Sequence, residues 1–263
     1  MECPLCGKKG YGIFKGKLLN KFVVQYYQCR NCGLIYTQTP YWLDEAYQDS
    51  ITCADTGIMV RNVRNVLCAN ALVDKVFDKK ASFLDYGGGY GVFTRMMRDV
   101  GYNWLWQDKY SENLFARGFE YREEEKIELV TAFELFEHFT EPKKELEHLF
   151  QLAGSLLFST LLYDKGLRYK PFSRWWYYVP QTGQHVVFYS ERTCRYIAGQ
   201  YGVNYYNLCD DLHLFTDKKL DDKWLRLYFK SKYSWFAQSY LYHRNSKNGK
   251  CFADMKKMIK MQG

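Results

Sequence analysis

The chain has 263 residues, enough for one α/β domain of ordinary size with a small appendage. With 47% apolar residues, 25% charged residues and only 5 prolines, its composition is globular and excludes a collagen-like or low-complexity protein. The sequence has no apolar run of about 18 residues, and its first residues lack a basic stretch followed by an apolar one. We therefore expect a cytoplasmic protein without membrane insertion.

The net charge of +8 is concentrated at the end of the chain. Residues 217–263 contain twelve Lys/Arg and four acidic residues, a surplus equal to the net charge of the whole chain, so the remainder is neutral. Aromatic residues are interleaved with these basic ones. Such a pattern can bind RNA, although a helix of this composition more often packs its rings on the protein body and leaves its charges in solvent. We expect residues 217–263 to form a basic helical extension.

The N-terminal segment carries two cysteine pairs, each followed by glycine. Two intervening residues let both thiolates of a pair face one ion, and four thiolates suit tetrahedral zinc in a closed, structural site. Two disulfides, chance spacing and an iron–sulfur centre are the alternatives. The run 22–28 between the pairs is strand-like, and residues 1–40 are predicted to form a metal ribbon. The four expected ligands are Cys3, Cys6, Cys29 and Cys32.

Strand and helix patterns then alternate along the chain. Apolar residues recur every three to four positions over 55–78, which predicts a helix. The stretch 161–189 interrupts the alternation. Strands separated by helices indicate an α/β fold with a parallel sheet and helices on both faces. Strands are expected at 82–85, 104–106, 127–133 and 155–160, further helices at 92–99, 112–117, 142–153 and after Ser190, and a closing hairpin at 204–208 and 212–215.

A glycine-rich turn follows the first of these strands. Asp85 ends the strand, and Asp108 follows the next strand, nineteen residues beyond Gly89. Glycine is needed where the backbone approaches a ligand or takes positive φ, and a carboxylate at the second position can accept both hydroxyls of a ribose. The glycines of the turn are Gly87, Gly88, Gly89 and Gly91.

Two kinds of nucleotide cofactor use such a turn. A nicotinamide cofactor is bound by G-x-G-x-x-G, which presents a helix N-terminus to a pyrophosphate. Here the glycine spacing is G-x-G-x-G, preceded two residues earlier by Asp85. A carboxylate at that place would repel a pyrophosphate but suits the cationic part of S-adenosylmethionine, so the pattern favours the methyl donor.

Three motifs together resemble the class I S-adenosylmethionine-dependent methyltransferases. They are D-x-G-x-G-x-G at 85–91, G-x(6)-D at 101–108, and E-x-x-E-H at 134–138 followed by Pro142. Cys32-Gly-Leu-Ile-Tyr36 followed by Tyr47 resembles the zinc-ribbon subgroup of that branch, whose members often methylate nucleotide-linked sugars or surface glycans. The resemblance covers roughly residues 1–215 and implies a Rossmann-like methyltransferase domain at 41–216, between the ribbon and the basic extension.

The resemblance also implies a set of site residues. Ala132 and Phe133 should border the donor, and Glu134, Glu137 and His138 should begin the loop beside the transferred methyl group. For Glu137 and His138, a structural pair capping the turn is the alternative. His185 follows the stretch where such folds place acceptor-binding elements, and it is the best general-base candidate, or else a hydrogen-bonded structural histidine. The aromatic run 175–178 either stacks on a sugar or base or lies in the core.

We therefore expect a methyltransferase that acts on a small molecule or glycan, such as a nucleotide-linked sugar or a surface polysaccharide precursor. The alternative is a ribosomal-RNA base methyltransferase, because one such family joins an N-terminal zinc module to this fold. The sequence lacks the Asn-Pro-Pro-aromatic motif of amino-group transfer, and the related sugar C-methyltransferases carry a C-terminal domain that this chain replaces with a basic tail. A third hypothesis is a binding protein that keeps the cofactor-binding fold but does not catalyse methyl transfer. The sequence does not determine the oligomeric state.

Overall fold

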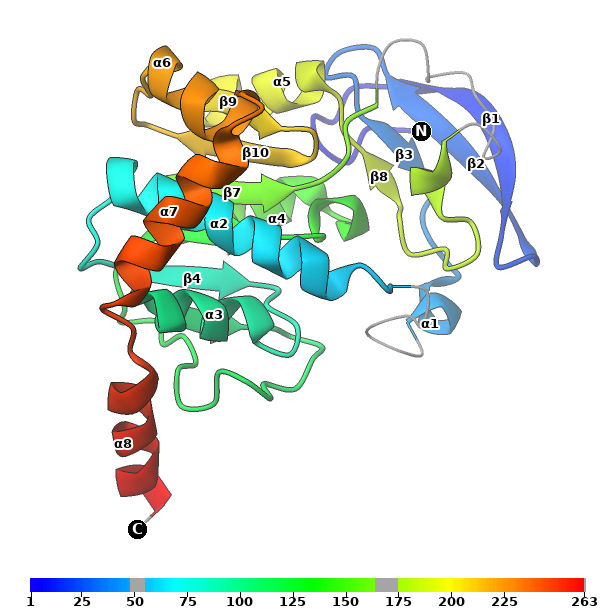
Figure 1. The fold of residues 1–263 in the computed structure, drawn as a ribbon. Coiled ribbons are helices and arrows are strands. Elements are labelled where there is room, and N and C mark those ends of the chain that lie inside the picture. Colours follow the sequence, from blue (N-terminus) through cyan, green and yellow to red (C-terminus); the bar gives the residue numbers. More distant parts are fainter. Residues whose placement is uncertain (48–54, 164–174, 263) are drawn as a thin grey trace. The chain divides into compact units, whose positions relative to one another are not determined.

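The computed structural model describes residues 1–47, 55–163 and 175–262 (Figure 1). The chain forms two compact units. One contains Met1–Cys53, Glu134–Gln151 and Phe158–Phe215, and the other contains Ala54–Phe133, Leu152–Leu157 and Thr216–Gly263. Along the described residues, no helix is both long enough and apolar enough to cross a membrane.

The first unit contains a four-stranded sheet of order β1-β2-β3-β8 with antiparallel neighbours. A three-residue loop, 19–21, joins β1 to β2, with positive φ at Leu19 and Asn20. The strand expected at 22–28 is confirmed, whereas β1, which is rich in glycine and lysine, was not predicted. The strands are β1 (Gly10–Leu18), β2 (Phe22–Cys29), β3 (Ile35–Thr37) and β8 (Val187–Phe188).

A second sheet has the strand order β5-β4-β6-β7-β10-β9. In its first half, β4 pairs in parallel with both β5 and β6, as the alternation of strands and helices predicted. The α/β fold with a central sheet flanked by helices is therefore confirmed. The strands are β4 (Ser82–Tyr86), β5 (Asn103–Gln107), β6 (Ile127–Ala132), β7 (Ser155–Ser159), β9 (Asn204–Cys209) and β10 (Leu212–Thr216).

Helix α2 (Ile58–Val76) packs against both α3 (Val92–Val100) and α7 (Ser234–Ser246) in the second unit, where Figure 1 shows α7 crossing α2. Its buried polar residue Asn70 accepts hydrogen bonds from Tyr102 Oη and Asn245 Nδ2, both at 2.9 Å. These bonds satisfy the amide oxygen of a fully buried side chain. They also fix α7, which belongs to the predicted extension, to the body of this unit.

The basic extension is helical, as expected, and is held by one buried ion pair. Asp254 of α8 (Cys251–Gln262) accepts two hydrogen bonds of 2.8 Å from the Arg98 guanidinium and one from Arg95. Both Arg98 and Asp254 are buried, so loss of either partner would leave an uncompensated charge in the interior. The extension also contains α6 (Asp222–Leu225) and a π-helical turn, η4 (Arg226–Lys230).

Some aromatic rings of the extension are buried and others are exposed. Trp224 and Phe229 are buried, as expected for rings that pack on the body. Trp235, Phe236 and Tyr240 are instead 60–66% exposed, so the expectation is wrong for α7. The reason is that α7 turns Gln238, Leu241 and Asn245 inward, and these polar and apolar residues share one helical face that excludes the rings.

In the first unit, α5 (Glu191–Tyr201) begins at the predicted Ser190, whose hydroxyl accepts the Thr193 N–H in a capping box. The other helical segments are α1 (Leu43–Ala46), η1 (Phe136–His138), α4 (Pro142–Leu152) and η3 (Trp176–Tyr178).

The helix expected at 112–117 is wrong. The structure describes these residues in full and they form bends and a turn. The N–H groups of Leu114 and Phe115 both bond to Tyr90 O, and Asn113 Oδ1 accepts the N–H of Ala116. Long-range and side-chain partners thus replace the i→i−4 bonds of a helix.

Candidate functional site

The glycine-rich turn connects β4 to α3 in the second unit. Gly87, Gly89 and Gly91 have φ values of 71°, 53° and 84°, in the left-handed region that glycine adopts without strain. Gly88 is required for a different reason. A Cβ atom there would lie 2.7 Å from Asp85 Oδ2, so a side chain has no room. Three glycines thus allow the turn its left-handed backbone, and Gly88 leaves room for the side chains of Asp85 and Trp106.

Asp108 lies beside this turn, where the sequence spacing predicted it. Its Oδ2 accepts the N–H of Gly89 at 2.9 Å, and its Oδ1 accepts the N–H groups of Tyr110 and Ser111 at 2.7 and 2.8 Å. Three backbone donors thus orient the carboxylate at the end of β5, and the side chain remains half-buried rather than covered. An acidic group held in this way can accept the hydroxyls of a ribose.

Asp85 has a different environment. It is only 2% exposed, and its two oxygens accept hydrogen bonds of 3.0 Å from the Thr94 and Thr131 hydroxyls. Burial raises the pKa of this carboxyl to about 7, and the charge of Asp108 adds to the increase, while the two threonine hydroxyls oppose it. The carboxyl thus links β4 to α3 and β6 beneath the turn.

Two residues that the resemblance placed beside the donor lie at the end of β6 and just after it. Ala132 is buried. The half-buried ring of Phe133 packs edge-on against the ring of Phe93, with the two ring centroids 4.9 Å apart. The next residue, Glu134, has φ of 49°, a left-handed conformation that costs a non-glycine residue about 1–2 kcal/mol. Its N–H donates to Ser159 Oγ at 2.7 Å, and Ser159 Oγ–H donates back to the Glu134 carboxylate at 2.7 Å. Strain held in place by such bonds is typical of functional sites.

Three further predicted residues come together in the first unit. Glu137 lies in η1 and is fully buried, and His138 and His185 are half-buried. One carboxylate oxygen of Glu137 and one nitrogen of each histidine all lie within 4.8 Å of one another. The two imidazole rings meet edge to face with their centroids 4.9 Å apart. A backbone hydrogen bond of 2.9 Å from Val186 N to Glu137 O holds the two segments together.

Both histidines are oriented by a second partner. His185 Nδ1 lies 2.7 Å from the carbonyl oxygen of Tyr177, and His138 Nδ1 lies 2.8 Å from the hydroxyl of Tyr47. Because a carbonyl oxygen only accepts, the neutral ring of His185 carries its proton on Nδ1 and has its lone pair on Nε2. Neither second partner was predicted from the sequence, although Tyr47 lies within a motif of the resemblance.

The surroundings keep both imidazoles neutral. Burial lowers the pKa of His138 to about 3, with a further decrease from His185, against an opposing effect of the Gln184 backbone. Burial also lowers the pKa of His185 to about 4, against the Tyr177 carbonyl and the charge of Glu134. At neutral pH both rings are therefore neutral, and each has one ring nitrogen without a proton.

The aromatic run 175–178 divides into two parts. Trp175, Tyr177 and Tyr178 are buried, which favours the core role, whereas Trp176 is 71% exposed. Burial and the carboxylates of Glu137 and Glu134 raise the pKa of Tyr177 well above its usual value. The hydroxyl of Tyr177 thus stays protonated next to these acids. Residues 164–174 of the same stretch lie outside the described part of the chain.

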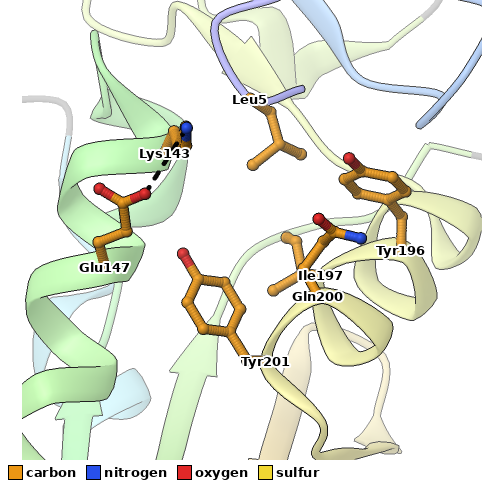
Figure 2. Close-up of a pocket in the computed structure, with 7 residues that line it drawn as sticks. All are labelled: Leu5, Lys143, Glu147, Tyr196, Ile197, Gln200 and Tyr201. Atoms are coloured by element: carbon orange, nitrogen blue, oxygen red, sulfur yellow. Dashed lines mark ion pairs between the residues drawn. The ribbon is translucent and has the colours of Figure 1, made fainter. Parts of the chain in front are cut away.

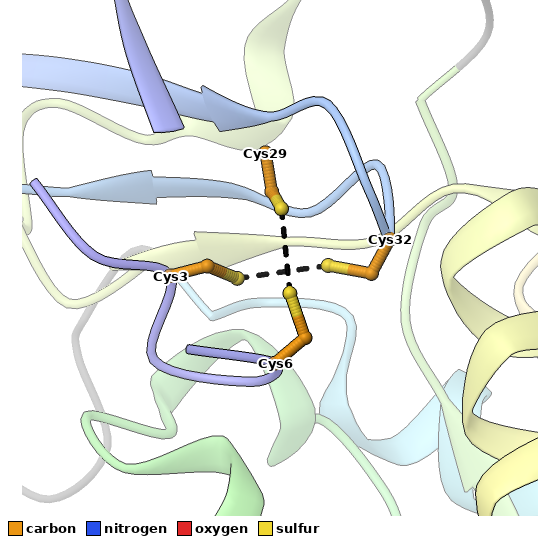
Figure 3. Close-up of side chains that lie close together, drawn as sticks. All are labelled: Cys3, Cys6, Cys29 and Cys32. Carbon is orange, nitrogen blue, oxygen red and sulfur yellow. Dashed lines mark hydrogen bonds between the residues drawn. The ribbon is translucent and has the colours of Figure 1, made fainter. Parts of the chain in front are cut away.

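The four cysteines of the N-terminal pairs converge on one point (Figure 3). Cys3 and Cys32 have their Sγ atoms 3.6 Å apart, and Cys6 and Cys29 have theirs 3.4 Å apart. Four thiolates around zinc at about 2.3 Å would be separated by about 3.8 Å, whereas disulfide sulfurs lie about 2.05 Å apart. The spacing fits a tetrahedral metal site and does not fit two disulfides.

A small pocket lies elsewhere in the first unit (Figure 2). Its volume is about 160 Å³, and its walls include Lys143 and Glu147 of α4 and Tyr196 and Tyr201 of α5. Lys143 and Glu147 form an ion pair of 3.7 Å across one wall. The pocket includes none of the predicted site residues, and it is smaller than the roughly 300 Å³ at which ligand pockets begin.

Comparison with known proteins identifies one family. Residues 54–208 match the model of a family described as a methyltransferase domain, and this match covers more than half of the chain. No curated protein matches the sequence.

Several solved structures have a similar chain path. Magnesium protoporphyrin IX methyltransferase from Synechocystis PCC 6803, with bound S-adenosylhomocysteine, is 17% identical over 66% of this chain and 90% of its own, with a TM-score of 0.45. An O-methyltransferase family 2 protein from Planctomyces limnophilus DSM 3776, in complex with apigenin, is 14% identical over 67% and 65%, with a TM-score of 0.44. Human N-acetylserotonin methyltransferase, in complex with S-adenosylmethionine, is 13% identical over 68% and 66%, with a TM-score of 0.42.

Proposed function

Because the chain belongs to the methyltransferase-domain family, it is an S-adenosylmethionine-dependent methyltransferase, and we propose that its acceptor is a small molecule or a glycan. A nucleotide-linked sugar or a surface polysaccharide precursor is the acceptor class we favour. The observation that carries the proposal is the cluster of Glu137, His138 and His185. It joins one buried carboxylate to two neutral imidazoles, which suits an acceptor that must lose a proton.

The donor is assigned to the glycine-rich turn and its neighbours. Gly87 and Gly89 give the turn its left-handed backbone, and Gly88 makes room for Asp85. Asp108, which the Gly89 N–H orients, is assigned to the ribose hydroxyls. Ala132 ends the neighbouring strand β6, Phe133 and Glu134 follow it, and all three are assigned to the border of the donor site. Asp85 is assigned to the support of the turn, because its oxygens are already bonded to Thr94 and Thr131.

Transfer of the methyl group is an in-line displacement at the carbon bound to the sulfonium. The new bond to the acceptor forms as the carbon–sulfur bond breaks, which leaves neutral S-adenosylhomocysteine and releases the acceptor proton. The protein has to align the two reactants and receive that proton. We assign proton removal from the acceptor to the cluster, with the lone pair on His185 Nε2 as the base.

The test is the formation of S-adenosylhomocysteine in the presence of candidate acceptors. We expect turnover with one or more nucleotide sugars or polyhydroxylated small molecules and none with ribosomal RNA. Turnover with RNA alone would overturn the acceptor class. If none of the acceptors supports turnover although S-adenosylhomocysteine binds, the chain is better described as a binding protein.

One observation favours RNA as the second candidate. Trp235, Phe236 and Tyr240 of α7 are exposed within the most basic part of the chain, and exposed rings among cations can stack on unpaired bases. This surface does not itself provide a group for methyl transfer. It makes RNA a specific alternative that salt dependence can test.

We also propose that the four cysteines hold one structural zinc ion, as in the zinc-ribbon subgroup. Their near-tetrahedral spacing supports this assignment. With all four positions filled by thiolates, the ion would have no place for a substrate, so it would stabilise the first sheet rather than take part in transfer. Such an ion would fix the end of β2, where Cys29 lies, to the N-terminal residues.

A further inference from the structure

Glu137, His138 and His185 form a ligand set of one carboxylate and two imidazoles. Their ligand atoms lie within 4.8 Å of one another, so one ion between them could contact all three after small adjustments of the side chains. Two of the ligands come from the single turn η1, and the third comes from the segment just before β8. The set is thus built from two parts of the chain that the Val186–Glu137 backbone bond holds together.

The surroundings of the three side chains are those of metal ligands. In metal sites, a ligating histidine is commonly oriented by a hydrogen bond on its other ring nitrogen. His185 has this arrangement through the carbonyl of Tyr177, which leaves Nε2 as a lone-pair donor. The hydroxyl of Tyr47 bonds to His138 in a similar way. Both rings are therefore fixed before any ligand arrives.

The charge of the region also favours a cation. Glu137 is fully buried next to the Tyr177 hydroxyl, and a buried carboxylate is stabilised both by such donors and by positive charge. A second carboxylate, that of Glu134, lies near His185 and Tyr177, three residues before Glu137 in the chain. Two carboxylates near two imidazole rings produce a negative local field, which a divalent ion would offset.

We propose that Glu137, His138 and His185 bind one divalent ion of the first transition row, whose open positions take oxygen atoms of the acceptor. The inference rests on the proposed function for the role of the ion, but the binding itself is independent of it. Two histidines and one carboxylate are typical of sites that keep open coordination positions. His185 Nε2 then serves as a ligand, and the ion acidifies the acceptor hydroxyl in place of a free base. The hydroxyl proton leaves to water, and the oxygen forms the bond to methyl as the carbon–sulfur bond breaks.

This site differs chemically from the cysteine site. Thiolates select zinc, whereas imidazole and carboxylate also accept Mn²⁺. Mn²⁺ is therefore the probe for the three-residue site when each chain carries only the one equivalent of zinc that its cysteines hold, because excess zinc would fill both sites. It is paramagnetic, so its binding and its ligands are visible by electron paramagnetic resonance.

The experiment titrates the zinc-loaded full chain with Mn²⁺ and follows the loss of the free-ion signal. We expect one bound Mn²⁺ per chain, with pulsed spectra that contain nitrogen couplings from imidazole. Glu137→Gln and His185→Gln should each weaken binding at least about tenfold. His148→Gln is the matched control, because His148 is an exposed histidine of α4 outside the cluster, and it should bind Mn²⁺ as the wild type does.

Absence of bound Mn²⁺ would overturn the inference, and so would either of two further outcomes. One is bound Mn²⁺ without nitrogen couplings, and the other is wild-type affinity in both cluster variants. The wild-type spectra decide the matter even if a variant misfolds. Binding of S-adenosylhomocysteine, measured on the same samples, separates the two proposals. If the cofactor binds and Mn²⁺ does not, only the metal site fails, whereas Mn²⁺ binding without cofactor binding leaves the metal site and removes the methyltransferase assignment.

Discussion

The backbone N–H of Gly89 donates a 2.9 Å hydrogen bond to the carboxylate of Asp108. This bond joins two motifs that follow neighbouring parallel strands, β4 and β5, so the turn and the acidic residue support each other. The same carboxylate also accepts two N–H groups of its own loop. Asp108 therefore orders the loop in the absence of a ligand and presents its remaining lone pairs for one.

Asp108→Ala is expected to weaken the binding of S-adenosylhomocysteine by about 1.5–3 kcal/mol, the usual range for a hydrogen bond to a charged group. The physical reason is the loss of the ribose acceptor, together with the loss of order in the turn. Isothermal titration calorimetry measures the change. Glu112→Ala is the control, since Glu112 is an exposed acid four residues later in the same loop and should leave the affinity unchanged. If Asp108→Ala binds S-adenosylhomocysteine as tightly as the wild type, the donor does not bind at this turn.

The cysteine site predicts one zinc ion per chain in protein purified without chelator. Cys29→Ser should reduce the zinc content well below one and lower the melting temperature, because the ion contributes folding free energy that the small sheet lacks. Elemental analysis and thermal unfolding provide the two measurements. Cys251→Ser is the matched control, because Cys251 is an exposed single cysteine in α8 and should retain the zinc. Metal-free protein with cysteines oxidised in pairs would contradict the assignment.

Local sequence patterns predicted the elements whose stability is local. The apolar periodicity over 55–78 marks α2, and Ser190 marks the start of α5, because helical faces and caps are encoded by nearby residues. The short strands β3 and β8 were not predicted from the sequence. Each consists of two or three residues, and their pairing joins Ile35 to Phe188, so only the tertiary structure brings them together.

The candidate site was predictable to different degrees. The spacing of Gly89 and Asp108 follows from a local strand–turn–helix pattern, and the structure brings these residues together. The approach of His138 to His185 involves residues 47 positions apart, one in η1 and the other just before β8, and no spacing rule predicts it. The resemblance named both residues, but their edge-to-face contact and their partners Tyr47 and Tyr177 emerge only in three dimensions.

The buried carboxyl of Asp85 predicts a pH-dependent contribution to stability. Its pKa is raised from 3.8 to about 7 by burial, so between these values the unfolded chain is ionised while the folded chain stays protonated. The unfolded state then binds fewer protons, and by linkage the free energy of unfolding decreases as pH rises from about 4 to about 7. Asp85→Asn removes this decrease, so its stability relative to wild type should rise across that window by on the order of 4 kcal/mol.

Chemical denaturation of wild type and Asp85→Asn at several pH values measures this difference directly. Contributions from other groups, including the buried histidines with lowered pKa values, are common to both proteins and cancel. A stability difference that does not change with pH would show that Asp85 is ionised in the folded protein throughout. It would then be available to attract the cationic donor, and its assignment to the support of the turn would be wrong.

The final prediction separates the two acceptor classes. If RNA is the acceptor, neutralising exposed cations of the extension should weaken binding and reduce its salt dependence. Lys219, Lys223 and Arg226 are exposed, whereas Lys218 pairs with Glu128 at 3.1 Å and is better left intact. Changing these three residues to Gln should reduce the salt slope by about 0.7 for each lost contact with a single strand.

If the acceptor is a sugar nucleotide, those three changes should leave turnover nearly unchanged, and His185→Ala should lower turnover without affecting donor binding. We expect this second pattern, because His185 lies in the cluster that removes the acceptor proton or binds the ion that acidifies it. Steady-state rates and calorimetry on the same two variants provide the comparison. Loss of methylation in the triple Gln variant, with full activity in His185→Ala, would replace the glycan assignment with RNA.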